Sequence, residues 1–297
     1  MNDKELVAFL DHYGHLRQPF GEQRGINSAV IPNLTISDQL VRDALESYQA
    51  FHSTPLEHIA SGIFSHITSP ITGELDKPTT ILLDMARCQN PDYAAANANA
   101  EEAGSGNWNG CHGIGPFHCA SVKFLNKPPD FLQPFMSTIW DRVVDAYSEI
   151  GLLFDRDDAA PSNIDISFVQ PDGGWIGLAI VGTGQGCQDQ IWARFDKNYK
   201  PANLVSEWTT LLKHELGHNC GLSHSQGGVM NPYIIPGLPV SWIGDVSAPL
   251  LRQRFGGASI PRKPTSRTLV LAWQLGTNEF EVIKTLDTDK PPTGIFG

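Results

Sequence analysis

Three histidines and one glutamate stand within eleven residues in the second half of the chain, at a spacing that suits a single metal ion. His214 and His218 are four residues apart, so on a helix they project from one face, one turn apart. A third ligand further along the same helix would point along its axis, but Gly221 can adopt the left-handed backbone that turns the chain back. His224 can then reach the same ion, and Glu215 stands beside the first ligand.

This set of side chains is typical of a catalytic zinc site. Three imidazoles leave the fourth position of a tetrahedral zinc open for water, whereas a fourth protein ligand closes a structural site. Zinc lowers the pKa of such a water to about 7 and polarises a carbonyl group, and Glu215 is placed to take the proton and deliver it to a leaving amine. The alternative is that these are ordinary histidines of a core helix. Chance would produce five such residues at these spacings on the order of once in 10⁴ to 10⁵ chains.

The pattern resembles the signature of the metzincin zinc peptidases. Met230, in the segment Gly-Val-Met-Asn-Pro, stands at the position of their Met-turn, whose thioether packs beneath the three imidazoles. Ser225 is similar to the residue that follows the third histidine in the matrixin branch, the matrix metalloproteinases. Only five residues separate His224 from Met230, a shorter link than matrixins have. The resemblance implies that Pro232 and Tyr233 form the wall of the S1′ pocket, the cavity that accepts the substrate residue just after the scissile bond. Because of the shorter link, this wall is expected to differ from that of matrixins.

An earlier segment, residues 85–92, resembles the end of a matrixin propeptide. Cys88 matches the cysteine that binds the catalytic zinc in the latent form, and Arg87 and Asp92 match residues that pair across the loop. Three positions depart from the family pattern and leave the shape of the loop open: Ala86, Gln89 and Asn90. A single cysteine in a loop is on its own more often incidental. The resemblance implies that this one is an inhibitory ligand.

The residues before this segment predict three short helices. Apolar residues recur at a spacing of three and four over residues 5–17 and 38–51. Asp76 and Pro78 predict the start of a third helix. Residues 1–92 are therefore expected to form a helical propeptide that acts as the protein's own inhibitor.

Two other functions fit parts of the sequence. Three-helix bundles also resemble peptidoglycan-binding modules, so the protein could be a non-catalytic binder of cell-wall or protein ligands with a structural zinc. Against this, a protein that only binds has no use for the carboxylate of Glu215. A zinc exopeptidase would need a carboxylate that anchors the substrate amine, and none is evident. The sequence therefore favours an endopeptidase that acts on peptide or protein substrates.

The order of the remaining elements is that of a matrixin catalytic domain. Residues 93–113 are small and polar and predict an activation linker; residues 114–257 form the expected catalytic domain, and residues 258–297 an extension with a β-hairpin. The expected fold class is α+β, with a twisted, mostly parallel sheet, an antiparallel edge strand, a long active-site helix and a Met-turn. The expected elements are strands at 120–125, 164–169, 176–181 and 190–195, and helices at 130–150, from Asn203, and at 246–255.

The expected edge strand has a function by resemblance. An extended substrate would pair with its four residues, Leu178, Ala179, Ile180 and Val181, by adding a strand to the sheet. Without the resemblance, an ordinary core strand is an equal reading. Matrixins also hold a structural zinc between these strands, but residues 155–200 contain no histidine, so one zinc is expected. Calcium is a second metal that the sequence allows, on Asp172, Asp189 or Asp196.

Composition excludes some partners. The chain of 297 residues has a formal net charge of −11 and no basic stripe, which argues against nucleic acid. No apolar run is long enough to span a membrane. We expect a monomer outside the cell, although the first residues lack the pattern of a secretory signal. With Cys88 kept for the metal, the favoured disulfides are Cys111 with Cys119 and Cys187 with Cys220.

Overall fold

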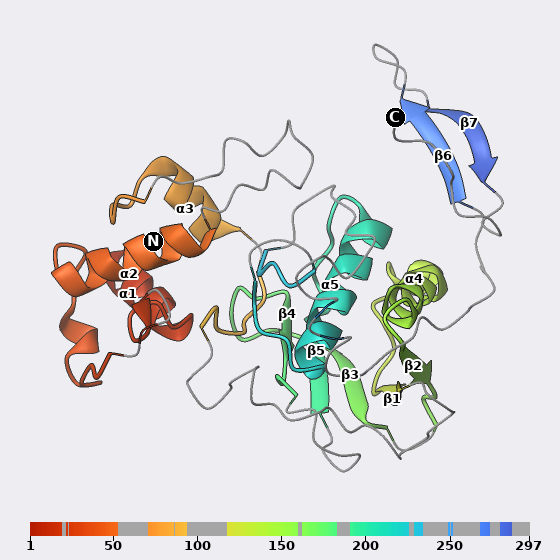
Figure 1. Cartoon of the computed structure of the whole chain (residues 1–297), viewed down its shortest axis with the longest axis horizontal. Helices are drawn as coiled ribbons and strands as arrows, with labels where there is room; N and C mark the ends of the chain where they lie inside the picture. Colours follow the sequence, from red (N-terminus) through yellow and green to blue (C-terminus); the bar gives the residue numbers. More distant parts are fainter. Residues whose placement is uncertain are drawn as a thin grey trace.

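The computed structural model describes two hydrophobic cores, one in the N-terminal helices and one around a sheet (Figure 1). It describes residues 1–19, 22, 24–52, 71–85, 87–93, 118–159, 162–182, 191–225, 229–233, 249, 251, 268–273 and 280–286. The expected linker and closing helix lie almost entirely outside this part of the chain, as do Cys111, Cys187 and the side chain of Cys119. The cleavage site, that helix and the disulfide pairs therefore stay predictions.

The N-terminal bundle consists of α1 (Asp3–His12), α2 (Gln39–His52) and α3 (Lys77–Asp84), with a short 3-10 helix, η2 (Ile31–Asn33). The expected cap of α3 is confirmed, because Asp76 accepts a hydrogen bond from the N–H of Thr79 at 2.8 Å. The expected extent of the first helix is wrong. α1 ends at His12 because Gly14 has a left-handed backbone, with φ 88°.

The second core surrounds a five-stranded sheet in the order β2-β1-β3-β5-β4. Its strands are β1 (His118–Phe124), β2 (Leu152–Arg156), β3 (Ile164–Val169), β4 (Gly177–Ala179) and β5 (Ile191–Asp196). Neighbouring strands are parallel except β4, which pairs with β5 in the antiparallel direction. The expected mostly parallel sheet with an antiparallel edge strand is thus confirmed, and β2 was not predicted. This mixed architecture is compatible with a metzincin-like fold.

Two helices pack on this sheet and on each other: α4 (Met136–Ser148) against β2, and α5 (Leu204–Asn219) against β4 and β5. The expected helix over 130–150 begins later than predicted. Residues Gln133–Phe135 form a 3-10 turn, η4, that contains Pro134, and α4 starts after it. Phe135, at the end of this turn, is 38% exposed. The hydroxyl of Tyr147 ties the helices together by donating to the carbonyl of Lys213 at 2.6 Å.

The edge strand is shorter than predicted. Of the four residues expected to pair with substrate, Leu178 and Ala179 lie in β4, but Ile180 and Val181 lie beyond its end. The N–H of Ile180 still donates to the carbonyl of Trp192 in β5 at 3.1 Å, and two residues later the N–H of Gly182 donates to the carbonyl of His218 at 2.8 Å. The placement of Ile180 and Val181 in the edge strand was therefore wrong.

The expected C-terminal hairpin is present as β6 (Thr268–Trp273) and β7 (Phe280–Leu286). The two strands pair antiparallel and form a separate two-stranded sheet, drawn at the upper right of Figure 1. In the part of the chain that the structure describes, no helix has both the length and the apolar character needed to cross a bilayer.

Candidate metal centre

α5 is buried from Ser206 to Asn219 and carries two of the three candidate ligands. Its start is fixed by Asn203, whose side chain accepts a hydrogen bond from the N–H of Ser206 at 3.2 Å. Its apolar face packs into the core of the sheet through Trp208, Leu211, Leu212 and Leu216. The helix ends where Gly221 has φ 86° and donates its N–H to His218 at 2.7 Å. This is the left-handed turn predicted at Gly221.

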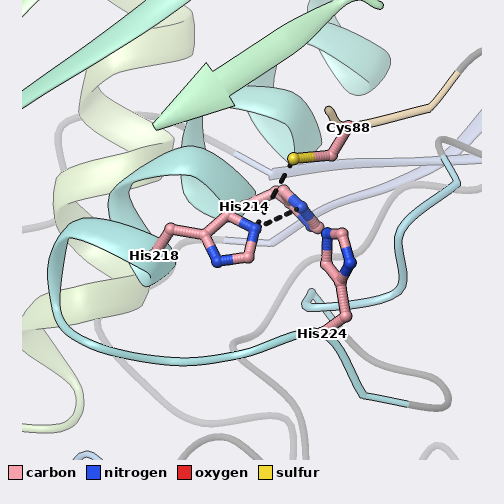
Figure 2. Close-up of side chains that lie close together, drawn as sticks. All are labelled: Cys88, His214, His218 and His224. Atoms are coloured by element: carbon pink, nitrogen blue, oxygen red, sulfur yellow. Dashed lines mark hydrogen bonds between the residues drawn. The ribbon is translucent and has the colours of Figure 1, made fainter. Parts of the chain in front are cut away.

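The turn brings His224 back to the two helical histidines, and Cys88 joins them from the N-terminal part of the chain (Figure 2). All four side chains are buried, and their candidate ligand atoms lie within 4.8 Å of one another. The Nε2 atoms of His214 and His218 are 3.1 Å apart, and the Sγ of Cys88 is 3.6 Å from the Nε2 of His218. The structure thus brings together residues that are more than a hundred positions apart.

The outer nitrogens of the three rings fix their protonation. His214 Nδ1 and His218 Nδ1 lie 2.7 Å from the carbonyl oxygens of Val229 and Leu222, and a carbonyl can only accept, so both nitrogens carry a proton. Their Nε2 atoms then carry no proton, and the two lone pairs face each other across 3.1 Å. His224 Nδ1 lies 2.9 Å from Asp92 Oδ1, and its buried Nε2 has no hydrogen-bond partner.

This geometry fits a zinc ion. Tetrahedral zinc, with bonds of about 2.0–2.1 Å to nitrogen and about 2.3 Å to sulfur, holds two nitrogens about 3.3 Å apart and sulfur about 3.6 Å from nitrogen. The observed separations are 3.1 and 3.6 Å. Burial lowers the pKa of His214 to about 3 and also lowers those of His218 and His224, so the rings are neutral at neutral pH. The two facing lone pairs, on His214 Nε2 and His218 Nε2, repel each other unless a cation lies between them. Together with the unpartnered Nε2 of His224, they offer such a cation three nitrogen ligands.

Glu215 lies at the edge of the cluster without belonging to it. Its Oε2 is 3.7 Å from Cys88 Sγ, and its Oε1 is buried without a hydrogen-bond partner. Burial raises the pKa of Glu215 to about 8, and the hydrogen bond from Cys88 offsets part of this rise. Burial and the charge of Glu215 also raise the pKa of the Cys88 thiol well above its ordinary value. The N–H of Asn90 and the charge of Arg87 offset part of this rise, and a cation at the imidazoles would favour the thiolate further.

Residues 87–92, which we name the Cys88 segment, are held between β4 and the segment after Met230. The N–H of Cys88 donates to the carbonyl of Pro232 at 2.9 Å, and the N–H of Gln89 donates to Gly177 at 2.9 Å. At the same edge, just before β4 begins, the N–H of Ile176 donates to the carbonyl of Arg87 at 3.2 Å. The segment therefore occupies the backbone hydrogen-bonding groups at the outer edge of the sheet.

The Cys88 segment is braced by the pair predicted from the sequence. Arg87 Nη2 donates to Asp92 Oδ1 at 2.6 Å, and the guanidinium lies 3.5 Å from the centroid of the Tyr13 ring. Burial alone would raise the pKa of Asp92, but the charge of Arg87 and hydrogen bonds from three imidazoles hold it well below its usual range. These imidazoles belong to His15, His52 and His224.

The other predicted residues fall in three places. Met230 is buried with its sulfur against α5 at Gly217, where a Cβ would overlap it. Tyr233 packs into the N-terminal core and its hydroxyl contacts that of Tyr48, while Pro232 bonds the Cys88 segment. Of the possible calcium ligands, Asp172 accepts from Trp175 and Asp196 from Asn198. Among described residues these two carboxylates are in no group of three metal-ligating side chains; Asp189 lies outside the described part.

Sequence reasoning missed three residues of the site. His15 and His52 surround Asp92, and with it they form a second group of metal-ligating side chain types. Gly177 passes so close to Glu215 that an added Cβ would overlap Oε1. No local pattern could reveal these contacts, because each joins positions far apart in the chain. A glycine within the strand expected at 176–181 was the one available signal, because a glycine inside a strand often marks the close approach of another group.

Comparison with known proteins indicates a distant relationship to the matrix metalloproteinases. The chain is similar to interstitial collagenase of Sus scrofa, with 27% identity over 187 residues, which cover 56% of this chain and 36% of the relative. It is similar to matrix metalloproteinase-18 of Xenopus laevis, with 27% identity over 217 residues, which cover 66% of this chain and 42% of the relative. The chain thus spans about two fifths of the length of these curated relatives. No family model matches it.

Proposed function

We propose that the protein is a latent zinc-dependent endopeptidase, with His214, His218 and His224 as zinc ligands and Cys88 as the inhibitory fourth ligand. One observation carries this proposal: bare imidazole nitrogens converge with a sulfur beside a buried carboxylate that has an unpartnered oxygen. The separations fit tetrahedral zinc, and the distant similarity to matrix metalloproteinases agrees with it. Residues 1–92 then act as the propeptide.

His214, His218 and His224 would hold the zinc, which would supply a Lewis acid for the scissile carbonyl and lower the pKa of the attacking water. Glu215 takes the proton of that water and delivers it to the leaving amine. The carboxylate reaches this position because β4 passes it at Gly177, where no side chain intervenes. The sulfur of Met230 packs against α5 at Gly217, where no side chain separates them.

Substrate binding follows from the groups that the Cys88 segment occupies. The N–H of Ile176 and the carbonyls of Gly177 and Pro232 now bond to this segment. An extended peptide that replaces it would meet the same groups by adding a strand to the sheet. Leu178, Ala179 and Tyr233 are the neighbouring side chains that such a peptide would contact. The domain limits given above, the monomeric state and an extracellular location remain part of this proposal.

A binding protein with a structural zinc fits the site less well. Burying a carboxylate is costly unless its oxygens are hydrogen-bonded, and Glu215 Oε1 has no partner. A site that only held zinc for stability would gain from a neutral or apolar residue here. The unpartnered oxygen therefore favours a role in proton transfer.

The test is zinc content together with cleavage of an unfolded protein, before and after limited proteolysis within residues 93–113. We expect about one zinc per chain, little activity in the intact chain, and cleavage of internal bonds after proteolysis. The Glu215→Ala variant, cut in the same way, is the matched control. A zinc-loaded, trimmed protein that cleaves nothing would contradict the proposal and favour the binding function, and release of terminal residues alone would indicate an exopeptidase.

A further inference from the structure

We infer that Asp92 of the Cys88 segment orients the metal ligand His224, so that the inhibitory segment tightens metal binding through two residues and its removal loosens the metal. This inference rests on the proposed zinc site. It assigns Asp92 a role beyond its ion pair with Arg87, as a positioning residue for the metal.

The three imidazoles differ in where their outer partners come from. His214 and His218 donate to the main-chain carbonyls of Val229 and Leu222, which follow them closely in the chain. His224 donates to the side chain of Asp92, which is 132 residues away. One of the three ligands is therefore oriented by the segment that is expected to leave on activation.

The carboxylate is well placed for this role. Asp92 is 3% exposed, and its Oδ1 lies 2.9 Å from His224 Nδ1 while also accepting from Arg87 at 2.6 Å. A metal-bound imidazole that donates to a carboxylate is fixed in its tautomer and ring orientation and becomes a stronger ligand. Loss of such an outer partner typically costs 10- to 100-fold in metal affinity.

Removal of the segment leaves His224 without its partners. Besides Asp92, the backbone of Pro91 hydrogen-bonds this ring, and both residues belong to the departing segment. His214 and His218 keep their carbonyls, because those belong to the part of the chain that carries α5. In the released enzyme, His214 and His218 therefore keep the hydrogen bonds that orient their rings, and His224 loses its own.

The test compares variants of the full chain in a Cys88→Ser background, which removes the direct sulfur ligand. The probe is zinc, and the readout is its release to an excess of chelator, which does not depend on activity. Asp92→Asn should weaken zinc binding by about 10- to 100-fold. The matched control is His15→Gln, because His15 bonds the other oxygen of Asp92 at 2.9 Å and does not touch His224.

A second readout separates orientation from general disturbance of the bundle. In the cobalt-substituted chain, each ligand ring gives its own shifted Nδ1 proton signal. Asp92→Asn should move the signal of His224 and leave those of His214 and His218, which bond to carbonyls, in place. Asp92→Glu, which keeps a carboxylate opposite Arg87, should restore part of the affinity.

Two results would overturn the inference. One is equal zinc release from Asp92→Asn and its Cys88→Ser parent; the other is equal acceleration by His15→Gln, which would mean that loosening the bundle suffices. If Asp92→Asn does not fold, the parent itself decides: a His224 Nδ1 proton that exchanges with solvent as fast as an exposed one is not held by Asp92. A parent that binds no zinc would instead defeat the proposed function.

Discussion

Two groups of buried imidazoles meet at Asp92, and they differ in what their ring nitrogens face. In the group of Cys88, His214, His218 and His224, the Nε2 atoms of His214 and His218 face each other at 3.1 Å, and neither can donate a proton to the other. In the group of His15, His52 and Asp92, the nitrogens point to a carboxylate oxygen, at 2.9 and 3.4 Å. Both have the residue types of a metal site. In the first group, the Nε2 atoms of His214 and His218 face each other as acceptors. In the second, His15 bonds Asp92 directly, and His52 Nε2 lies near the same oxygen without a well-formed hydrogen bond.

Charge separates the two groups further. Asp92 is already paired with the guanidinium of Arg87 at 2.6 Å, so a divalent cation beside His15 and His52 would be buried next to an arginine. That arrangement is costly in a buried site. The imidazoles around Asp92 are better described as hydrogen-bond donors that hold a charged carboxylate in place. The direction of the lone pairs and the charge nearby, rather than the number of histidines, distinguish a metal site.

The most direct way to break this comparison is to remove one histidine from each group. His218→Ala should lose the bound zinc, because two imidazoles and a sulfur no longer complete the site. His52→Ala should keep it, since its ring faces Asp92. Elemental analysis of both variants checks this. Two equivalents of zinc in the unaltered chain, falling to one in His52→Ala, would show that the second group also binds metal.

The next largest effect, on peptide cleavage, is expected for Glu215. One oxygen of its carboxylate has no hydrogen-bond partner, whereas the carboxylate of Asp92 accepts hydrogen bonds from several donors. In the trimmed protein, Glu215→Ala should lower peptide cleavage by a factor on the order of 10² to 10⁴ and leave zinc in place. Glu207→Gln is the control, because Glu207 is buried on the same helix but bonds Tyr199 at 3.0 Å. Equal losses in both variants would point to helix stability instead.

The sulfur ligand should decide whether the intact chain is silent. Cys88→Ser should cleave peptides without any trimming, because a hydroxyl is a far weaker zinc ligand than a thiolate. Cys220→Ala, at the end of α5, should stay latent. The assay is peptidase activity of the uncut chains. A silent Cys88→Ser together with an active trimmed form would mean that the bundle blocks by its bulk alone.

The close passage of β4 predicts a moderate loss of activity. Gly177→Ala places a methyl group against Glu215 Oε1, so the carboxylate must move while the zinc ligands stay in place. In the trimmed protein we expect kcat to fall and zinc content to remain unchanged. Gly174→Ala is the control, since an added Cβ there meets nothing within 4 Å. Equal kcat values for the two variants would remove Gly177 from the positioning of Glu215.

The smallest effect concerns pH and the second group. Burial lowers the pKa of His52 to about 4, although the carboxylate of Asp92, as an acceptor and as a negative charge, raises it in part. The free ring titrates near 6.5, so the docked bundle binds fewer protons than the undocked one and becomes less stable as the pH falls from about 6.5 to 4. His52→Phe should reduce this dependence, measured as cleavage of the linker by an added protease. Charged groups facing His52 are Asp92 and Arg87.

The site was more predictable from the sequence than the contacts that hold it. The spacing of His214, His218 and His224 and the turn at Gly221 are local, so helix geometry was enough to predict their meeting. The Arg87–Asp92 pair was also local. Contacts between Asp92 and His224, or Gly177 and Glu215, join distant positions and depend on how two cores dock. β2 was missed because it follows α4 after only a short turn, Glu149 to Gly151. α4 also starts later than expected, after the turn that contains Pro134, and the spacing of apolar residues does not show this.

The order of the contacts along the chain has a consequence for synthesis. Cys88 and Asp92 precede the residues that they contact by 127 to 132 positions. A ribosome therefore completes the segment proposed as the inhibitor before α5 has been made. When the three imidazoles first come together, the Cys88 sulfur is already tethered in the same chain, at a high effective concentration. Under the proposed function, the site would thus close as it forms.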